Sequence, residues 1–345
     1  MPRSPSHPAA SRASRIAVGL VLLGLVGTAT PAGRLLPGAV RWVAPTLWAI
    51  GFLGTVVFGV WRLFRPGRGR LRGLAALVVA VGSLPAAAWL SGMLVGERHA
   101  VGVDGVRRRY HVDLPGGEAA RPWPVVLALH GFGQSWWGMR EITRLDRVAR
   151  AGQALVAYPE GHLRSWNDGD DLKPATRAGV DDLGFLRALI RDLERRYPVD
   201  PDRVYAVGFS NGGFLLVRYA CGLADELAAI GVVAAGVYPI WAEACRGQPL
   251  PPAAFVLGER DPMLRPLERF EVSPRASERL WRPLASGGAS AVALWSLAGH
   301  GHGWPGGPQF LPSLLVGPIR QDWRATDSLT AFLWRHRRHA AKESP

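Results

Sequence analysis

Short apolar runs of strand length alternate with amphipathic helical patterns from residue 104 onward. Each run is apolar almost without interruption, which predicts strands that are buried on both faces of a sheet. Between two of them, residues 179–196 place apolar side chains at steps of three and four, as a helix with one apolar face does. The alternation therefore predicts an α/β domain with a mainly parallel sheet flanked by helices. The predicted strands are 125–129, 154–158, 204–208, 228–235, 254–258 and 291–297.

The first 96 residues have a different composition from the rest. They contain ten Arg and no Asp or Glu, and the first acidic residue is Glu97. These Arg account for most of the formal net charge of +14. We therefore predict an N-terminal part over 1–96 and a folded domain over 97–345. No signature of nucleic-acid binding accompanies the positive charge, so nucleic acid is not an expected partner.

Three stretches of the N-terminal part carry no charged side chain. They are 16–33, 42–61 and 73–96, with 18, 20 and 24 residues. A helix of about 20 residues spans about 30 Å, the thickness of the hydrocarbon core of a bilayer. Helices of a soluble bundle would show a polar face, which these stretches lack. We predict three transmembrane helices in a lipid bilayer, although 16–33 alone also fits a cleaved signal peptide.

The distribution of Arg predicts how the chain crosses the membrane. Three Arg precede the first stretch, two lie between the first and second, and five lie in 62–72. Positively charged loops stay on the cytoplasmic side. The N-terminus and the 62–72 loop are then cytoplasmic, and the domain over 97–345 is extracytoplasmic. The expected location is the cell membrane, with several passes.

A glycine-rich turn follows the predicted strand 204–208. Residues 208–213 read G-F-S-N-G-G and open a helical pattern. In G-x-S-x-G between a strand and a helix, the Ser occupies a tight turn where larger flanking residues would collide with the backbone. The pattern predicts Ser210 as a nucleophile. It also places the backbone amide of Asn211 at the helix N-terminus, where it can donate to an oxyanion.

A Ser hydroxyl becomes reactive when a His accepts its proton and a carboxylate orients that His. Asp261 and His302 each follow a predicted strand, and they come after the Ser in the chain order expected for such a site. His300 competes with His302 for the role of base. Glu259 competes with Asp261, although a surface ion pair with Arg260 is the simpler role for Glu259.

A second glycine-rich loop follows the first predicted strand. Residues 130–133 read H-G-F-G, and the backbone amide of Phe132 would be the second donor to the oxyanion. The loop fails the dinucleotide pattern G-x-G-x-x-G, because Trp136 stands where the third Gly is needed. No metal-binding motif such as H-E-x-x-H is visible. We therefore expect no cofactor and no metal.

The two cysteines, Cys221 and Cys245, both lie in the part predicted to be exported. An oxidising compartment allows a disulfide between them. Their spacing alone leaves two buried thiols as an alternative, because it does not show whether the side chains meet.

Several segments together resemble the polyhydroxybutyrate depolymerase and feruloyl esterase family of α/β-hydrolases. The resemblance covers about 104–340 and implies the α/β-hydrolase fold and an ester substrate. In this family the His of the G-H-x-W-P-G segment is catalytic, which implies His302 and not His300. The matching segments are L-H-G (129–131), Y-P-E-G (158–161), S-W-N (165–167), V-D-D (180–182) with Phe185, D-P-x-R-V-Y (200–205), G-x-S-N-G-G (208–213) and G-H-x-W-P-G (301–306).

The resemblance also implies roles for residues outside the triad. The family carries cysteines after the nucleophile helix and before the acid strand, which implies a disulfide between Cys221 and Cys245. Trp304 and Trp166 match positions that line the substrate pocket, with core packing as an alternative for Trp166. The acid segment departs from the usual H-G-T-x-D and reads L-G-E-R-D over 257–261.

These patterns predict a membrane-anchored serine carboxylic-ester hydrolase that works through an acyl-enzyme. One alternative is an acyltransferase acting on a cell-envelope lipid or sugar, because the same three residues serve transfer and hydrolysis. A second is a non-catalytic binding domain on a hydrolase fold, which an intact set of catalytic residues disfavours.

Overall fold

The chain divides into two compact units, Met1–Val95 and Gly96–Pro345. Within the part of the chain that the structure describes, no helix is both long and apolar enough to cross a membrane. The predicted spans lie outside the described residues, apart from a few positions in the second and third, so they stay predictions. The computed structural model describes residues 55–58, 60–61, 74, 77–78, 96–264, 277–281 and 292–338.

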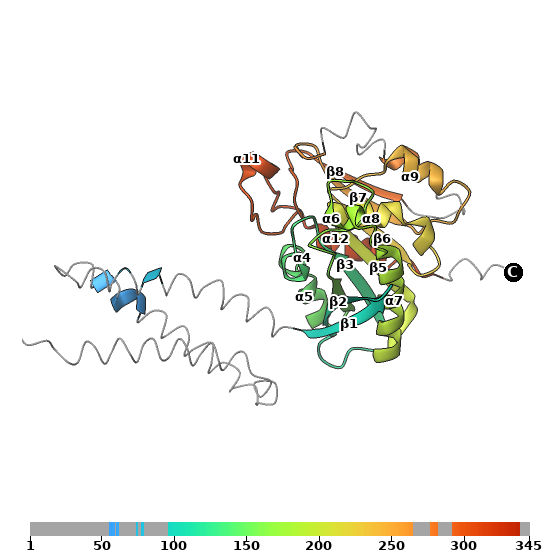
Figure 1. Cartoon of the computed structure of the whole chain (residues 1–345), viewed down its shortest axis with the longest axis horizontal. Coiled ribbons are helices and arrows are strands. Elements are labelled where there is room, and N and C mark those ends of the chain that lie inside the picture. Colours follow the sequence, from blue (N-terminus) through green and yellow to red (C-terminus); the bar gives the residue numbers. More distant parts are fainter. Residues whose placement is uncertain are drawn as a thin grey trace, which may run out of the picture. The chain divides into compact units, whose positions relative to one another are not determined.

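An eight-stranded sheet forms the centre of the second unit, in the order β1-β2-β4-β3-β5-β6-β7-β8 (Figure 1). Strand β2 pairs antiparallel with β1 and β4, and all other neighbours are parallel. The prediction of a mainly parallel sheet is confirmed. The strands are β1 (Glu97–Val103), β2 (Val106–Asp113), β3 (Trp123–Leu129), β4 (Leu155–Pro159), β5 (Val199–Phe209), β6 (Ala229–Val233), β7 (Ala253–Gly258) and β8 (Val292–Leu297).

Strands β1 and β2 are absent from the six predicted from apolar runs. Strand β1 lies at the edge of the sheet, and none of its residues is buried. Strand β2 carries three consecutive Arg, one of which, Arg108, is buried. An edge strand and a strand with a buried charge both lack the continuous apolar run that identifies a central parallel strand.

Helices cover both faces of the sheet. In Figure 1 the sheet lies between α4 and α5 on one side and α7 on the other. The helices are α4 (Trp136–Thr143), α5 (Leu145–Arg150), α6 (Pro174–Arg177), α7 (Asp182–Arg196), α8 (Asn211–Arg218), the 3₁₀ helix η3 (Cys221–Leu223), α9 (Pro239–Ala244), α11 (Ser313–Val316) and α12 (Ala325–Leu333).

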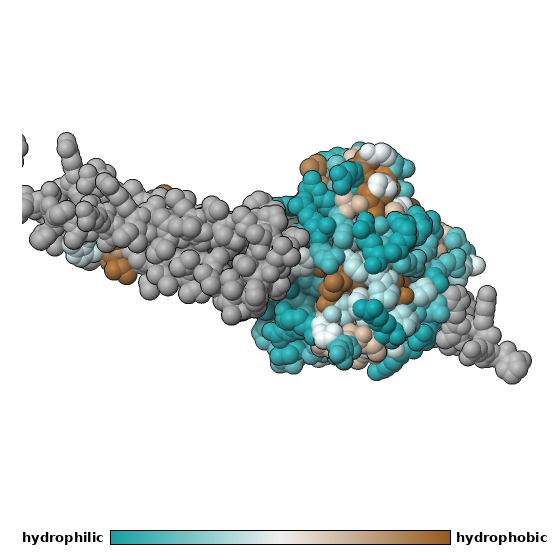
Figure 2. All heavy atoms as spheres, turned by 90° about the horizontal axis from the view of Figure 1, so that it is seen from below, coloured by the Kyte–Doolittle hydropathy of each residue, from teal (hydrophilic) through white to brown (hydrophobic). Residues whose placement is uncertain are grey.

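Alternate residues of one strand serve two separate cores. Leu127 of β3 packs in the core shared with α7 and α8, whereas Val126 packs in the core shared with α4, α5 and α12. This follows from the alternation of side chains along a strand. The face of the unit seen in Figure 2 is mostly hydrophilic, as expected when the long apolar runs are buried in the two cores.

The predicted helix over 179–196 begins later than the apolar pattern suggested. Helix α7 starts at Asp182, because the Asp181 side chain caps it by accepting a hydrogen bond from the Gly184 amide at 2.8 Å. Sequence periodicity does not show which of several acidic residues is the cap.

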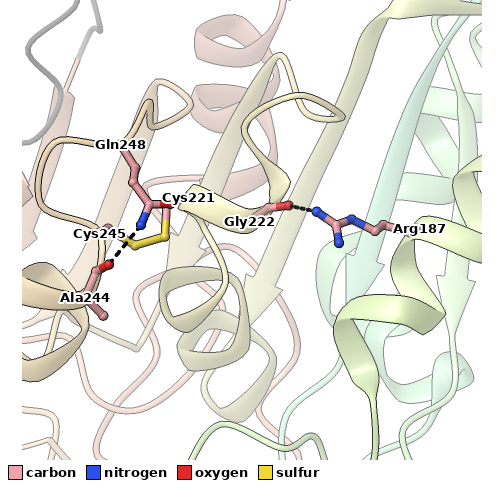
Figure 3. Close-up of a disulfide and its surroundings, with 6 residues drawn as sticks. All are labelled: Arg187, Cys221, Gly222, Ala244, Cys245 and Gln248. Carbon is pink, nitrogen blue, oxygen red and sulfur yellow. Dashed lines mark hydrogen bonds between the residues drawn. A yellow bond between two sulfur atoms is a disulfide. The ribbon is translucent and has the colours of Figure 1, made fainter.

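A disulfide joins Cys221 of η3 to Cys245 at the end of α9, with the two Cα atoms 5.6 Å apart (Figure 3). The pairing implied by the family resemblance is therefore present. Arg187 of α7 donates to the carbonyl of Gly222, next to the bridge, at 2.5 Å. The bridge thus connects the segment that follows α8 to the segment that precedes β7.

Candidate active site

Ser210 occupies the turn between β5 and α8, with φ 50° and ψ −118°. Such a backbone conformation is strained for a residue with a side chain. The flanking glycines allow the turn: a Cβ on Gly208 would lie 2.4 Å from the Gly212 carbonyl oxygen, and a Cβ on Gly212 would lie 2.5 Å from that of Leu129. The turn therefore requires Gly on both sides of Phe209-Ser210-Asn211.

Three predicted residues meet at the carboxyl ends of the strands. The Nε2 atom of His302 lies 2.8 Å from the Oγ atom of Ser210, and its Nδ1 atom lies 2.7 Å from Oδ2 of Asp261. The other carboxylate oxygen of Asp261 accepts the amides of Met263 and Leu264 at 2.8 and 3.0 Å. The structure thus brings Ser210, His302 and Asp261 into one hydrogen-bonded chain.

The register of the sheet explains this meeting. Gly258 at the end of β7 lies opposite Leu297 at the end of β8, so the loops that carry Asp261 and His302 leave the sheet side by side. Likewise Leu129 of β3 lies opposite Gly208 of β5. The loop after β3 therefore emerges beside the turn that carries the Ser.

His300 is held away from Ser210. Its Nδ1 atom accepts the Arg320 amide at 3.1 Å, and its Nε2–H donates to the Gly303 carbonyl at 3.1 Å. Burial lowers the pKa of His300, which suits the neutral ring that these two bonds require. His300 therefore holds the loop in place. Glu259, the competing acid, accepts a hydrogen bond from Ser296 at 3.1 Å and is not part of the chain from Ser210 through His302 to Asp261.

The H-G-F-G loop lies beside the nucleophile and is held by a neutral His. His130 donates through Nδ1 to the Gly131 carbonyl at 2.8 Å and accepts the Gly161 amide at Nε2 at 3.0 Å. Burial lowers the pKa of His130 to about 4, so the ring remains able to accept a hydrogen bond at neutral pH.

The amides of this loop are nearly all occupied. The Gly131 amide donates to Gln134 Oε1 at 3.0 Å, and the Gly133 amide donates to the Arg164 carbonyl at 2.8 Å. Among the described residues, the amides of Phe132 and Asn211 have no partner. These are the two amides that the sequence predicts for the oxyanion.

The Asn211 side chain has a role that the sequence did not show. Its Oδ1 accepts the Trp166 amide at 2.8 Å, and its Nδ2 donates to the Trp166 carbonyl at 3.1 Å and to Asp168 Oδ2 at 2.5 Å. All three residues are buried, and burial raises the pKa of Asp168. The segment 165–168 therefore clamps the start of the nucleophile helix.

Trp166 lies in the core and not in the substrate pocket. Its side chain is 0% exposed, stacks on Phe185 and donates from Nε1 to the His130 carbonyl at 2.8 Å. The predicted substrate-binding role was therefore wrong, and the alternative of core packing is the one that the structure shows. The place of Trp166 in the S-W-N segment did not show in which direction its side chain points.

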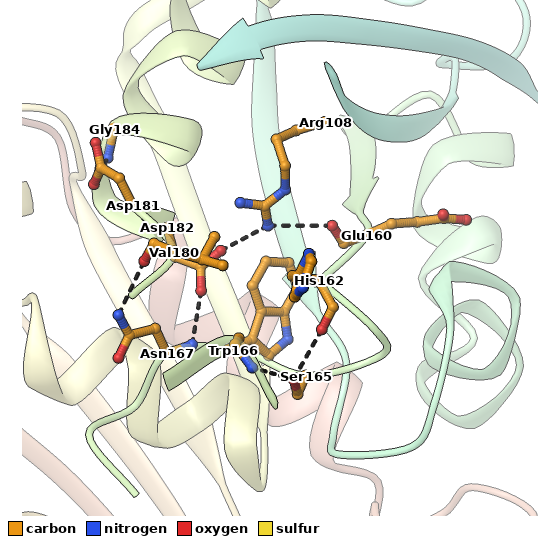
Figure 4. Close-up of polar contacts among 12 residues, drawn as sticks. Arg108, Glu160, His162, Ser165, Trp166, Asn167, Val180, Asp181, Asp182 and Gly184 are labelled. Carbon is orange, nitrogen blue, oxygen red and sulfur yellow. Dashed lines mark hydrogen bonds and ion pairs between the residues drawn. The ribbon is translucent and has the colours of Figure 1, made fainter. Parts of the chain in front are cut away.

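A buried ion pair also holds the segment 165–168 in place (Figure 4). Arg108 of β2 donates to Asp182 Oδ1 at 2.6 Å, and Asp182 Oδ2 accepts the Asn167 amide at 2.7 Å. The Asn167 side chain donates to the Val180 carbonyl at 2.9 Å. The S-W-N and V-D-D segments, which both belong to the family resemblance, are hydrogen-bonded to each other.

A cavity of about 200 Å³ opens beside Ser210 and His302. Its wall includes Phe132, Phe209 and Trp304, and the Trp304 side chain is fixed by a 3.0 Å hydrogen bond from Nε1 to Thr326 Oγ1. None of the described residues that line it is Asp, Glu, Lys or Arg. Groups of three or more potential metal ligands are absent from the described residues.

The strand order, the strained Ser between strand and helix, and the Ser-His-Asp chain define the α/β-hydrolase class. Within this class, the known sequences that are similar to the chain are named esterases. The chain is 29% identical over 281 residues to the putative esterase NocK of Nocardia uniformis subsp. tsuyamanensis, covering 67% of this chain and 80% of NocK. No protein-family profile matches the chain.

Two further relatives are named feruloyl esterases. Feruloyl esterase B of Piromyces equi is 30% identical over 127 residues, covering 35% of this chain and 23% of that protein. The probable feruloyl esterase C of Aspergillus niger is 25% identical over 143 residues, covering 38% and 47%. The chain thus spans most of NocK but less than half of either feruloyl esterase.

Among solved structures, a thermostable esterase superimposes with a TM-score of 0.49 and 18% identity, covering 70% of this chain and 63% of that one. An S-formylglutathione hydrolase from Agrobacterium tumefaciens superimposes with a TM-score of 0.48 and 16% identity, covering 69% and 94%. The chain is thus similar to proteins named esterase and feruloyl esterase. Together with its Ser-His-Asp chain, this similarity makes it a carboxylic ester hydrolase of the α/β-hydrolase class.

Proposed function

We propose that the chain is a membrane-anchored serine esterase that cleaves carboxylic esters through an acyl-enzyme. The observation that carries the proposal is the hydrogen-bonded chain from Ser210 through His302 to Asp261 beside two amides without partners. A non-catalytic binding domain would have no need of a strained Ser held in this arrangement.

In the proposed first step, the Ser210 Oγ atom attacks the acyl carbon and His302 Nε2 takes the hydroxyl proton. The carbonyl oxygen becomes an oxyanion, which the amides of Phe132 and Asn211 bind. When the intermediate collapses, the bond to the leaving oxygen breaks, and His302 returns the proton to that oxygen. The alcohol leaves, and the acyl group remains on Ser210.

In the second step, water attacks the acyl carbon. His302 accepts a proton from this water and then gives it to the Ser210 oxygen as the carboxylic acid leaves. Asp261 accepts a hydrogen bond from His302 Nδ1–H throughout, which selects the tautomer with a free Nε2 lone pair and stabilises the imidazolium.

The proposed membrane anchor rests on the three uncharged stretches within 1–96, and the proposed extracytoplasmic position rests on the Arg distribution. The disulfide supports export, because such bonds persist in oxidising compartments. Protease added to intact, wall-stripped cells should degrade the domain, whereas a domain protected until the cells are lysed would contradict this orientation. Release of the chain from membranes by alkaline carbonate would contradict the anchor.

The substrate class is tested on the full chain with short p-nitrophenyl esters, feruloyl esters and hydroxybutyrate oligomers. Ser210→Ala should abolish turnover and labelling by a fluorophosphonate probe, whereas Ser328→Ala on α12 serves as a matched control and should keep both. Turnover that persists in Ser210→Ala would refute the proposed nucleophile. Addition of a cell-envelope lipid or sugar distinguishes transfer, because an acylated acceptor would then replace the free acid.

A further inference from the structure

A group of apolar side chains is exposed next to the catalytic cavity. The segment 310–316, here named the apolar loop, includes α11 and exposes Phe310, Leu311, Leu314 and Leu315. Leu314 is 92% exposed and Leu315 is 57% exposed. In Figure 1 α11 projects from the body of the domain. Contiguous exposed apolar side chains on a protein surface usually mark a binding site.

The apolar loop is fixed to the loop that carries the catalytic base. The His302 amide donates to the Val316 carbonyl at 2.5 Å, and the Gly301 amide donates to the Pro318 carbonyl at 2.7 Å. The Gln309 side chain closes the base of the loop by donating to the carbonyls of Leu311 and Gly317 at 3.1 and 3.3 Å. The exposed side chains are therefore held in a defined place.

Part of the apolar loop lines the cavity beside Ser210. Phe310, Leu311 and Val316 belong to the lining, whereas Leu314 and Leu315 follow on the same loop and are not part of it. The side chains of Phe132 and Met263 also line the cavity and are exposed. The cavity that contains the nucleophile is therefore lined in part by exposed apolar side chains.

We infer that the apolar loop binds the acyl chain of a long-chain, lipid-like ester whose carbonyl carbon lies at Ser210. The inference rests on the proposed esterase function and names the substrate of that same site. An alkyl chain that continues past the cavity would remove its own surface and that of Leu314 and Leu315 from water. A charged acyl group would find no opposite charge among the residues that line the cavity.

The test compares chain lengths on the full chain in one non-ionic detergent. We expect kcat/KM for p-nitrophenyl dodecanoate to exceed that for the acetate by at least about tenfold, since each methylene removed from water favours binding in the transition state. The double variant Leu314→Ser/Leu315→Ser should lower the dodecanoate-to-acetate ratio of kcat/KM by about tenfold. Because both side chains are exposed, the unfolding temperature should stay near that of the wild type.

A control is Ile240→Ser on α9, which removes another exposed apolar side chain (73%) outside the cavity and should leave the ratio unchanged. A ratio that stays unchanged in the double variant would overturn the inference. A loss confined to esters embedded in vesicles, with monomeric esters unaffected, would also overturn it, because the loop would then contact a lipid surface. Neither result touches the proposed esterase activity, which fails if acetate turnover does not depend on Ser210.

Discussion

The Nε2 atom of His302 lies 2.8 Å from the Oγ atom of Ser210, although 92 residues separate the two in the sequence. His300, only two residues from His302 and also buried, instead bonds the Gly303 carbonyl and the Arg320 amide. The two histidines of one short loop therefore have different tasks, one in proton transfer and one in holding the loop.

Alanine at each of these two positions should separate the tasks. His302→Ala should lower kcat for ester hydrolysis by about 10³-fold or more, because the Ser hydroxyl loses its proton acceptor. His300→Ala should lower kcat far less but reduce the free energy of unfolding by about 1–3 kcal/mol, because a buried carbonyl and a partly buried amide lose their partner. Steady-state kinetics and chemical denaturation measure both. A larger loss of kcat in the His300 variant would reassign the base.

The side chain of Asn211 should stabilise the start of the nucleophile helix without itself donating to the oxyanion. Asn211→Ala leaves Asp168 and the Trp166 backbone groups buried without this partner, so the free energy of unfolding should fall by about 1–3 kcal/mol and kcat should fall with it. In a double-mutant cycle with Asp168→Ala, the two losses should be less than additive. Strict additivity would show that the two side chains are not coupled.

Acid should destabilise the protein through His130. Burial lowers the pKa of His130 from 6.5 to about 4 in the folded state, so between these values the unfolded chain binds a proton that the folded chain does not. The contribution of this group to stability is therefore fully present above pH 6.5 and is lost as pH falls toward 4, by about 3 kcal/mol in total.

Denaturant titrations at several pH values measure this loss. In His130→Gln the free energy of unfolding should fall less steeply with acid than in the wild type over the same window. His300, whose pKa burial also lowers, is present in both proteins and cancels in the difference. Equal slopes in the two proteins would exclude His130 as the source.

Reduction of the bridge between Cys221 and Cys245 should destabilise the domain. The bridge closes a loop with a sequence separation of 24 residues, for which the loss of unfolded-chain entropy amounts to about 3 kcal/mol. Dithiothreitol should therefore lower the unfolding temperature of the wild type. The Cys221→Ala/Cys245→Ala variant should already unfold at the lower temperature and show no response to the reductant, and a response there would point to a different cause.

The sequence predicted most of the central sheet, because its parallel strands are continuous apolar runs. It did not predict β1 and β2, whose charged residues interrupt any such run. The sequence also did not predict the buried ion pair between Arg108 and Asp182. A charged residue is expected to be exposed when only the sequence is known. The structure is needed to find the ion-pair partner that allows it to be buried.

Sequence alone determined the features that depend on neighbours along the chain: the apolar strands, the glycine turn around Ser210, and the residue types able to form the site. Only the tertiary structure decided that His300 holds its own loop, that Trp166 lies in the core, and that part of the apolar loop lines the cavity. The reason is physical. Backbone conformation at a turn is set by local steric limits, whereas the direction of a side chain is set by packing against segments that lie far away in the sequence.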